Sequence, residues 1–252
     1  TLALIGIGAL GYRFGGLRLG VTLAFAWAAY PFTQYVSNSN SNDAIMPALL
    51  IWGLVFVTSA PARGLFLGLA AWTKFASLLL LPLWASYPKA WKWPRQQLRF
   101  AAGFLAATVL AFWMLLLEPD PIHAARVFWD RTFGWQLSRE SPFSIWDWKE
   151  YPGFPDLHVL QTVLKGLLVA AAVVLALIPR TRNVVQLAAL TAALLIGFEL
   201  VLTHWFYLYI PWFFPFVAFA VLVPAAVRVA EPEPLPEDSG DERQVGELVP
   251  SR

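Results

Sequence analysis

The chain has 252 residues, of which 58% are hydrophobic and only 13% are charged. Soluble domains carry roughly 25% charged residues, so this composition excludes an ordinary soluble enzyme. The 13 Trp, 19 Phe and 7 Tyr also exclude an intrinsically disordered chain, which would be poor in aromatic residues. The remaining class is a polytopic membrane protein. Because there is no cysteine, disulfides and thiolate chemistry are excluded as well.

The net charge of +2 hides an uneven distribution of charge along the chain. Residues 229–252 contain seven acidic and two basic residues, whereas residues 1–228 contain sixteen basic and nine acidic ones. The sequence therefore divides into a membrane domain over 1–228 and an acidic, proline-rich tail over 229–252. The composition of the tail is typical of a disordered, solvated segment.

Apolar runs separated by short polar breaks predict an all-α membrane bundle with about seven to nine membrane segments, because helices satisfy their own backbone in lipid. We expect segments near 1–11, 17–36, 44–60, 65–85, 100–117, 158–178, 184–203 and 205–228. The first run is too short to cross a bilayer, which takes about 20 residues. Since it begins at Thr1 without a signal-peptide pattern, we infer an N-terminal truncation.

The orientation follows from the distribution of Lys and Arg, which favour cytoplasmic loops. Loop 86–99 holds four bases and no acid, and the break 179–183 holds two bases, so both are predicted to be cytoplasmic. Loops 37–43 and 118–157 are predicted to lie outside. Arg63, in the short break 61–64, is predicted to lie inside.

These assignments conflict over the segment 65–85. If 61–64 and 86–99 are both cytoplasmic, one straight helix cannot join them. We therefore predict that the segment is broken near Thr73–Lys74, as two short helices or a re-entrant pair. Irregular backbone at membrane depth is tolerated where it lines a cavity.

Lys74 is the most informative residue, because a lysine in the middle of the bilayer costs about 2.5 to 3.5 kcal/mol. It is predicted to contact a phosphate held in the membrane; the alternative is a helix break that lets the ammonium reach water. Asn42 and Asp43 end a polar turn between two apolar helices. Asp43 is interpreted either as a helix N-cap or as a carboxylate facing an outer cavity, where it would bind a metal or an acceptor hydroxyl.

Loop 118–157 is too long to be a simple connection. Residues 121–137 form an amphipathic pattern that predicts a helix lying on the membrane surface. The stretch that follows contains Arg139, Trp146 and Asp147. Flat aromatic rings together with carboxylates and arginine are typical of a carbohydrate site, where the rings contact C–H faces and the charged groups bind hydroxyls and phosphate. The alternative is a lid whose aromatic residues only anchor it at the interface.

The junction 203–212 places His204 and Tyr207 at the outer boundary, and the buried Glu199 one turn earlier is a candidate partner of His204. His204 is a candidate to donate a hydrogen bond to a phosphate oxygen or to act as a base, since histidine titrates near neutral pH. Lys165 lies about two turns from its helix end and is interpreted as a snorkelling, structural residue.

Several kinds of site are missing from the sequence. It has no phosphate-binding glycine loop, no dinucleotide fingerprint and no histidine pair with metal-binding spacing. Nucleic acid is not an expected partner, because orientation explains the basic loop. No cofactor is certain, although a divalent metal remains compatible with the carboxylates.

Four blocks together resemble one family: residues 20–50, with Asn42–Asp43; residues 62–84, with Gly64, Gly68 and Thr73–Lys74; residues 131–146; and residues 204–216. In residues 10–225 the chain resembles the GT-C superfamily of integral membrane glycosyltransferases. Within it, the chain is similar to the bacterial family 87 mannosyltransferases that use polyprenyl-phosphate mannose.

This resemblance implies transfer of mannose or a related hexose, with inversion, from a polyprenyl-phosphate donor to a lipid or glycan acceptor outside the bacterial cytoplasmic membrane. It implies Lys74, Arg139 and His204 as contacts of the donor phosphate. Asn42, Asp43, Trp146, Asp147, Glu199 and Tyr207 are the expected acceptor or cavity residues. The family's catalytic Asp follows the first membrane helix, so we expect the base upstream of Thr1. The alternatives are a transporter or flippase for a lipid-linked or polar solute, and a noncatalytic membrane scaffold.

Overall fold

The computed structural model describes residues 1–39, 41–89, 94–135, 141 and 144–230. Its longer helices are α1 (Leu2–Ala29), α3 (Ile45–Val55), α4 (Ala60–Thr73), α6 (Pro94–Phe112), α9 (His158–Leu177), α10 (Val184–Val201) and α11 (Phe214–Ala230). Shorter elements are α2 (Pro31–Asn38), η1 (Phe75–Leu80), α5 (Leu81–Ala85), η2 (Trp113–Leu117), α7 (Pro121–Trp129), η3 (Asp130–Gly134), η4 (Ile145–Glu150) and η5 (Ile210–Trp212).

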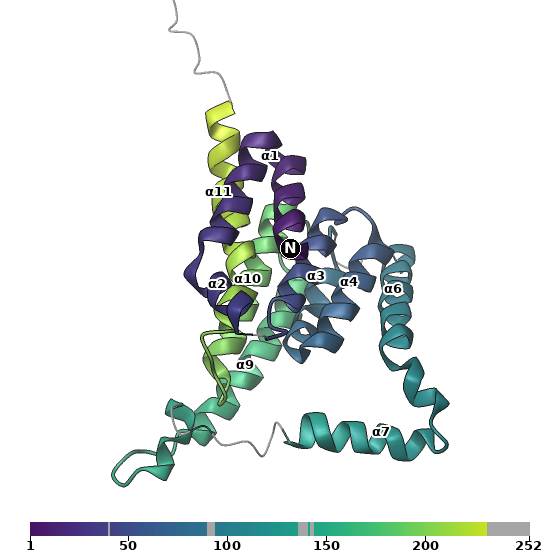
Figure 1. Ribbon diagram of the computed structural model, residues 1–252, viewed down its shortest axis with the longest axis vertical. Helices are drawn as coiled ribbons and strands as arrows, with labels where there is room; N and C mark the ends of the chain where they lie inside the picture. Colours follow the sequence, from purple (N-terminus) through teal and green to yellow (C-terminus); the bar gives the residue numbers. More distant parts are fainter. Residues whose placement is uncertain (40, 90–93, 136–140, 142–143, 231–252) are drawn as a thin grey trace, which may run out of the picture.

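The described chain is a helical bundle without a sheet, as the apolar composition predicts (Figure 1). Four of its helical stretches are long and apolar enough to cross a membrane: Leu2–Ala29, Pro94–Leu117, His158–Leu177 and Val184–Val201. These four candidate spans indicate a multi-pass membrane protein. Side chains of α6 and α9 remain largely unburied, which is typical of helices that face lipid.

The first helix is a tight hairpin. Its backbone leaves helical geometry at Gly15 and Gly16, and Gly16 has a φ of 70°. A Cβ on Gly11 would lie 2.8 Å from the Cα of Gly20, so the two arms are in backbone contact. In a straight helix these residues would be about 13 Å apart. The break that the sequence predicts between segments 1–11 and 17–36 is thus confirmed. It is shorter than predicted, because only Gly15 and Gly16 leave helical geometry.

Helices α4 and α6 pack closely along their length through small residues. A Cβ on Gly64 would lie 1.9 Å from the Phe100 carbonyl oxygen, and a Cβ on Gly103 would lie 2.0 Å from that of Pro61. Small residues spaced by four allow backbones to approach in this way. Further along, the Trp72 indole donates a hydrogen bond to Thr108 Oγ1 at 2.9 Å. The contacts advance in the same direction on both helices, so α4 and α6 are parallel.

Parallel packing of α4 and α6 requires the intervening chain to turn back. Helix α4 ends at Thr73, and Lys74 has extended backbone with φ −146° and ψ 118° before η1 and α5 return. The Arg63 guanidinium, near the start of α4, donates to the Tyr87 carbonyl oxygen just beyond α5 at 2.9 Å. Both ends of the segment therefore lie at the same end of the bundle, and the predicted break at Thr73–Lys74 is present. We call α4 together with η1–α5 the re-entrant pair.

Other segments differ from prediction in their limits. The predicted segment 44–60 is helical only over Ile45–Val55, and the segment 205–228 begins as a helix only at Phe214. Pro61 and Pro211 stand at or near these changes, and proline starts a helix more readily than it continues one. Helix α11 extends to Ala230, two residues into the predicted tail, and the rest of that tail lies outside the described residues.

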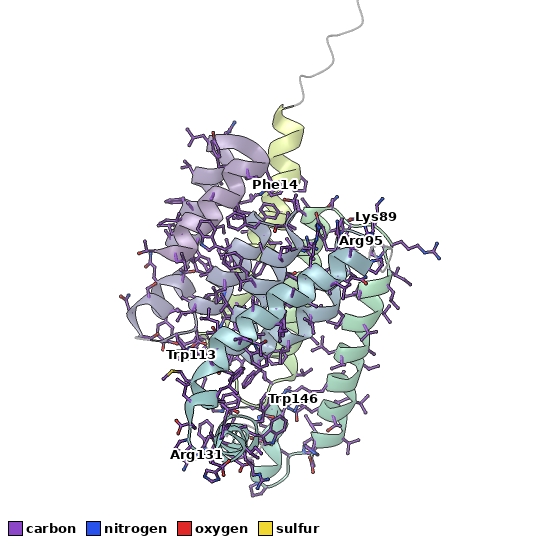
Figure 2. The ribbon with its side chains drawn as sticks, turned by 90° about the vertical axis from the view of Figure 1, so that its right-hand side faces the viewer. Phe14, Lys89, Arg95, Trp113, Arg131 and Trp146 are labelled. Carbon is purple, nitrogen blue, oxygen red and sulfur yellow. The ribbon has the colours of Figure 1, made fainter. Side chains whose placement is uncertain are left out.

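Basic residues gather at one end of the bundle, which we call the basic end. Arg63 and Arg182 are almost fully buried there and donate to backbone carbonyls of Val57, Tyr87 and Leu175. Arg182 also donates to Ser86 Oγ at 3.1 Å. Figure 2 shows Lys89 and Arg95 near this end, and Arg131 and Trp146 at the opposite end. We call the opposite end the acidic end, because it also holds Asp120, Asp130 and Asp147. This separation agrees with the predicted orientation, in which the basic end is cytoplasmic.

The first prediction concerns the close contact of α4 with α6. Replacing Gly64 with Ala should lower the melting temperature in detergent, because the new methyl group would overlap the Phe100 backbone. Gly166 is the matched control, since a Cβ there meets nothing within 4 Å and alanine is the better helix former by up to about 1 kcal/mol. Equal melting temperatures for the two variants would contradict this packing.

The second prediction concerns the re-entrant pair. The chain has no native cysteine, so single-cysteine variants report the side of the membrane without background labelling. Thr58→Cys and Lys89→Cys, which flank the pair, should both react with a membrane-impermeant maleimide from the cytoplasmic side. Asp156→Cys should react from the opposite side. Labelling of Thr58→Cys and Lys89→Cys from opposite sides would mean that 60–85 crosses the membrane.

Candidate functional site

Asp43 lies in the polar turn between α2 and α3 and is buried. Its Oδ2 accepts a hydrogen bond from the Ser41 hydroxyl, and its backbone N–H donates to Ser41 Oγ at 3.1 Å. The N-cap of α3 is Ala44, without a side-chain cap. The interpretation of Asp43 as a helix cap is therefore wrong, because its carboxylate is engaged elsewhere. Asn42 belongs to the same turn, where its carbonyl oxygen accepts from the Ile45 N–H at 3.0 Å.

Lys74 forms an ion pair with Asp43, with 2.9 Å between Nζ and Oδ1. The Asp43 side chain is 6% exposed and that of Lys74 is 25% exposed. At this distance the attraction is about 6 kcal/mol for an effective dielectric constant of about 20. Desolvation of the two charges offsets much of it. The pair therefore adds little net stability, but it fixes where the two charges lie.

The break in the α4–η1 segment presents Lys74 to this carboxylate. Because the backbone of Lys74 is extended, its side chain does not follow the surface of α4. The polar turn before α3 places Asp43 beside the Lys74 side chain. Both residues lie toward the acidic end, because α4 has by then run alongside α6 as far as Trp72 and Thr108. The structure thus joins two residues that the sequence singles out separately, 31 positions apart.

A row of aromatic rings connects Lys74 with His204. The Lys74 ammonium lies 5.8 Å from the centre of the Trp212 ring, and Trp212 stacks on Tyr209 at 4.3 Å. Tyr209 contacts Phe206 edge-on at 6.2 Å, and Phe206 contacts His204 edge-on at 4.8 Å. Rings in such arrangements add about 0.5 to 1.5 kcal/mol per pair, so the row gives the irregular segment 202–213 a defined shape.

Glu199 is a second carboxylate near this row, 5% exposed in the last turns of α10. Its carboxylate interacts with the Trp205 side chain, whereas Oε1 has no hydrogen-bond partner within the described part of the chain. Tyr207 is exposed; its ring stacks with Phe32 at 6.0 Å and contacts Trp205 edge-on at 5.1 Å. The carboxylate of Glu199 is thus buried beside three exposed aromatic side chains, those of Trp205, Phe206 and Tyr207.

The amphipathic helix of the long loop lies against the start of η1. Asp120 caps α7 by accepting from the His123 N–H at 3.0 Å, and the helical turns continue through η3. Phe133 stacks on Trp129 at 4.5 Å and on Phe75, the residue after Lys74, at 4.2 Å. The predicted helix is thus present over the described part of 121–137, and its aromatic face meets the re-entrant pair.

The second half of the loop is anchored to α10. Trp146 is buried and its indole donates to the Leu200 carbonyl oxygen at 3.1 Å. Asp147 Oδ2 accepts from the Ser141 N–H at 2.6 Å. The Trp146 ring therefore supports the loop and is not presented at the surface as a flat platform. Arg139, the predicted phosphate contact, lies outside the described residues.

The described residues contain no group of three His, Asp or Glu side chains close enough to hold a metal ion. Within that part of the chain, a divalent metal would find the paired Asp43 and the isolated Glu199, but no complete set of ligands.

Sequence reasoning overlooked two residues of this site, Ser41 and Trp212. Ser41 lies in the polar turn that the sequence marks as a unit, and a hydroxyl two residues before a carboxylate is a typical local hydrogen-bond partner. Trp212 is one of several aromatic residues that cluster within 203–212. No pattern distinguishes it from the other aromatic residues of 203–212, because its contact with Lys74 depends on the tertiary fold.

Comparison with known protein families, characterised proteins and solved structures finds no match for this chain.

The third prediction tests the coupling of Lys74 with Asp43. Lys74→Met should lower the free energy of unfolding by about 2 kcal/mol, because it leaves the Asp43 charge buried and unpaired. Breaking a fully buried ion pair typically costs about 3 to 5 kcal/mol, and the expected loss is smaller here because Lys74 is partly exposed. The double variant with Asp43→Asn should lose less than the sum of the two single variants, measured by SDS titration in mixed micelles. Additive losses would show that the residues are not coupled.

Proposed function

We propose that this chain is a membrane glycosyltransferase that moves mannose or a related hexose from a polyprenyl-phosphate donor to a lipid or glycan acceptor. The observation that carries the proposal is the Asp43–Lys74 pair at the break of the re-entrant segment. A partly exposed ammonium held at membrane depth is suited to a phosphate that is itself tethered to a membrane lipid. The sequence resemblance to the GT-C superfamily supports the same activity.

In this proposal the acceptor hydroxyl attacks the anomeric carbon of the sugar. A new bond forms between the acceptor oxygen and that carbon, while the bond to the phosphate oxygen breaks and the phosphate stays on the polyprenyl chain. Lys74 stabilises the negative charge of the departing phosphate, exchanging part of its contact with Asp43 for the new anion. His204, at the other end of the aromatic row, is a second candidate contact of the phosphate.

The acceptor proton must pass to a base. Asp43 is held by Ser41 and Lys74, so we do not assign the base to it. Trp205 and Tyr207 are exposed near the buried Glu199 and are suited to the apolar faces of a sugar. In this scheme Glu199 and Tyr207 belong to the acceptor side.

The arrangement in the membrane is also part of the proposal. In addition to α6, α9 and α10, the two arms of α1 and the shorter apolar helices α3, η1–α5 and α11 would lie within the bilayer. That arrangement has eight segments, within the seven to nine that the sequence predicts. The basic end would face the cytoplasm of a bacterium and the Asp43–Lys74 pair would face outward. Sugar transfer would then take place on the outer side of the cytoplasmic membrane.

A transporter or flippase is the second candidate, and two observations favour it. The break at Lys74 is the kind of discontinuous helix that forms substrate sites in transporters, and Glu199 is a buried carboxylate in a candidate span. The two candidates differ in outcome: a transferase makes a new glycosidic bond, whereas a transporter moves its solute unchanged.

The fourth prediction tests the role of Lys74. In membranes containing the protein and radiolabelled polyprenyl-phosphate mannose, Lys74→Ala should reduce label transfer to the acceptor fraction by about 10²-fold. That is the size of effect seen when a single charge-stabilising donor is removed. Lys74→Arg should retain more activity than Lys74→Ala, because a positive charge is kept.

Lys89→Ala, an exposed lysine at the basic end, is the matched control and should transfer label at the wild-type rate. Wild-type transfer by Lys74→Ala would refute its role. Uptake of unchanged label into sealed vesicles, without any product, would favour the transporter instead.

A further inference from the structure

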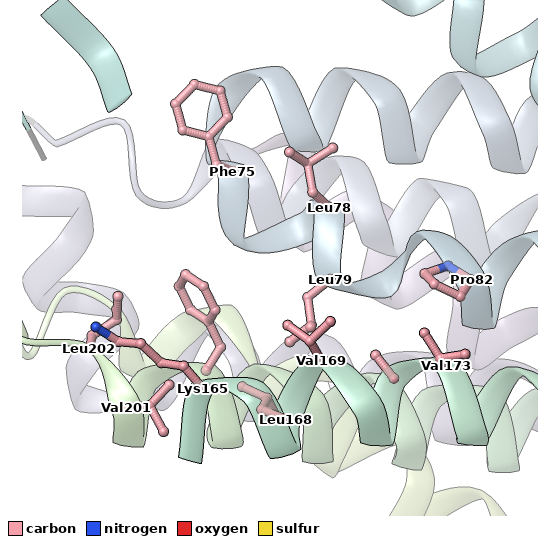
Figure 3. Close-up of a pocket in the computed structure, with 12 residues that line it drawn as sticks. Phe75, Leu78, Leu79, Pro82, Lys165, Leu168, Val169, Val173, Val201 and Leu202 are labelled. Atoms are coloured by element: carbon pink, nitrogen blue, oxygen red, sulfur yellow. The ribbon is translucent and has the colours of Figure 1, made fainter. Parts of the chain in front are cut away.

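A groove of about 380 Å³ runs between the re-entrant pair and helix α9 (Figure 3). One wall carries Phe75, Leu78 and Pro82, and the facing wall carries Leu168 and Val173. All but one of its lining side chains are apolar; the exception is Lys165. Figure 3 shows the Lys165 side chain at one end of the groove, extended beside Leu202.

The groove is accessible from the side of the bundle. Val169 and Val173 line it and are 57% and 49% exposed, although both belong to a helix apolar enough to cross a membrane. In a bilayer their exposed surface meets lipid chains, so hydrocarbon is the material that fills the space. An apolar groove of this shape and length is suited to one extended chain.

The polar end of the groove holds charges of both signs. Lys165 lies about two turns into α9, and Asp147 is close enough to interact with it electrostatically. Asp147 is held in place by the Ser141 N–H at 2.6 Å, and its neighbour Trp146 is fixed to Leu200. The loop thus holds a carboxylate near the Lys165 ammonium, at the end of the groove nearer the acidic end of the bundle.

The groove is separate from the Asp43–Lys74 pair. Phe75, the residue after Lys74, lines the groove and stacks on Phe133 of the long loop at 4.2 Å. Lys74 does not line the groove, and its charge is already matched by Asp43. A ligand of the groove would therefore meet Lys165 and Asp147 and not the ion pair.

We propose that the groove binds a zwitterionic phospholipid of the outer leaflet, with one acyl chain along the apolar walls and the phosphate on Lys165. The lipid's ammonium group then faces Asp147, so both charges of the headgroup are matched. Phosphatidylethanolamine has this pattern of charges. A polyprenyl phosphate carries only negative charge and would be repelled by Asp147, which argues against the same groove holding a glycosyl donor.

The proposal is tested on the full chain purified in mild detergent, with native mass spectrometry used to count bound phosphatidylethanolamine and phosphatidylglycerol. The wild-type protein should retain one phosphatidylethanolamine in preference to phosphatidylglycerol. Lys165→Gln should weaken this binding at least about tenfold, the change expected when an interaction of about 1.4 kcal/mol is lost. Val169→Trp should block it by filling the groove.

Two further variants complete the experiment. Val163→Trp adds the same bulk at an exposed position of α9 outside the groove and should bind lipid like the wild type. Asp147→Asn should shift the preference toward phosphatidylglycerol, because the partner of the ammonium is lost. The helical content of each variant, measured by circular dichroism, establishes that it is folded.

Equal lipid retention by the wild type, Lys165→Gln and Val169→Trp would overturn the proposal. Retention of added polyprenyl phosphate in place of phosphatidylethanolamine would also overturn it and would make the groove part of a donor site. Neither result depends on sugar transfer, so the proposal stands or falls independently of the proposed activity.

Discussion

One charged residue in an apolar segment determines much of this architecture. A lysine cannot remain unpaired in hydrocarbon without a cost of about 2.5 to 3.5 kcal/mol, so the chain around Lys74 has to give it a partner or a path to water. The structure does both: the backbone becomes extended at Lys74, the chain turns back, and Asp43 lies 2.9 Å away while a quarter of the lysine side chain stays exposed. The ion pair and the reversal are two consequences of the same constraint.

The chain reversal is stabilised at the basic end of the bundle, where the residues before and after the re-entrant pair are hydrogen-bonded to the same arginine. Arg63 donates to carbonyl groups on either side of the re-entrant pair, and Arg182 connects Ser86 with the end of α9. Burial raises the pKa of the Tyr87 phenol beside Arg63, so that side chain stays neutral. Carbonyl groups take the place of carboxylates as partners of these arginines, and the glycine contacts of α4 with α6 keep the returning chain close to the bundle.

The acidic end, in contrast, is shaped by aromatic side chains. The row from Trp212 to His204 connects the ion pair with the end of α10, and Phe133 connects the long loop with the re-entrant pair. The charged groups and the apolar groove are thus neighbours with different surroundings: Asp43–Lys74 is enclosed by polar and aromatic groups, whereas Lys165 stands at the edge of the lipid. This separation is a requirement of the activity that we propose, in which a charged lipid is the substrate.

The sequence by itself determined the class of fold, the long apolar helices and the break at Thr73–Lys74. The long helices follow from runs of hydrophobic residues, and the break follows from the basic residues on both sides of 65–85. Both signals are visible in the order of residues along the chain. The sequence also marked Asp43 and Lys74, because charges in apolar surroundings are conspicuous, but it left Asp43 as either a helix cap or a carboxylate facing an outer cavity. Only the tertiary structure decided that the two residues pair, that Trp212 lies over Lys74, that Trp146 is an anchor and that Lys165 borders a groove. Those outcomes depend on how segments far apart in the chain approach one another, and a one-dimensional pattern of polarity does not encode the distance between them.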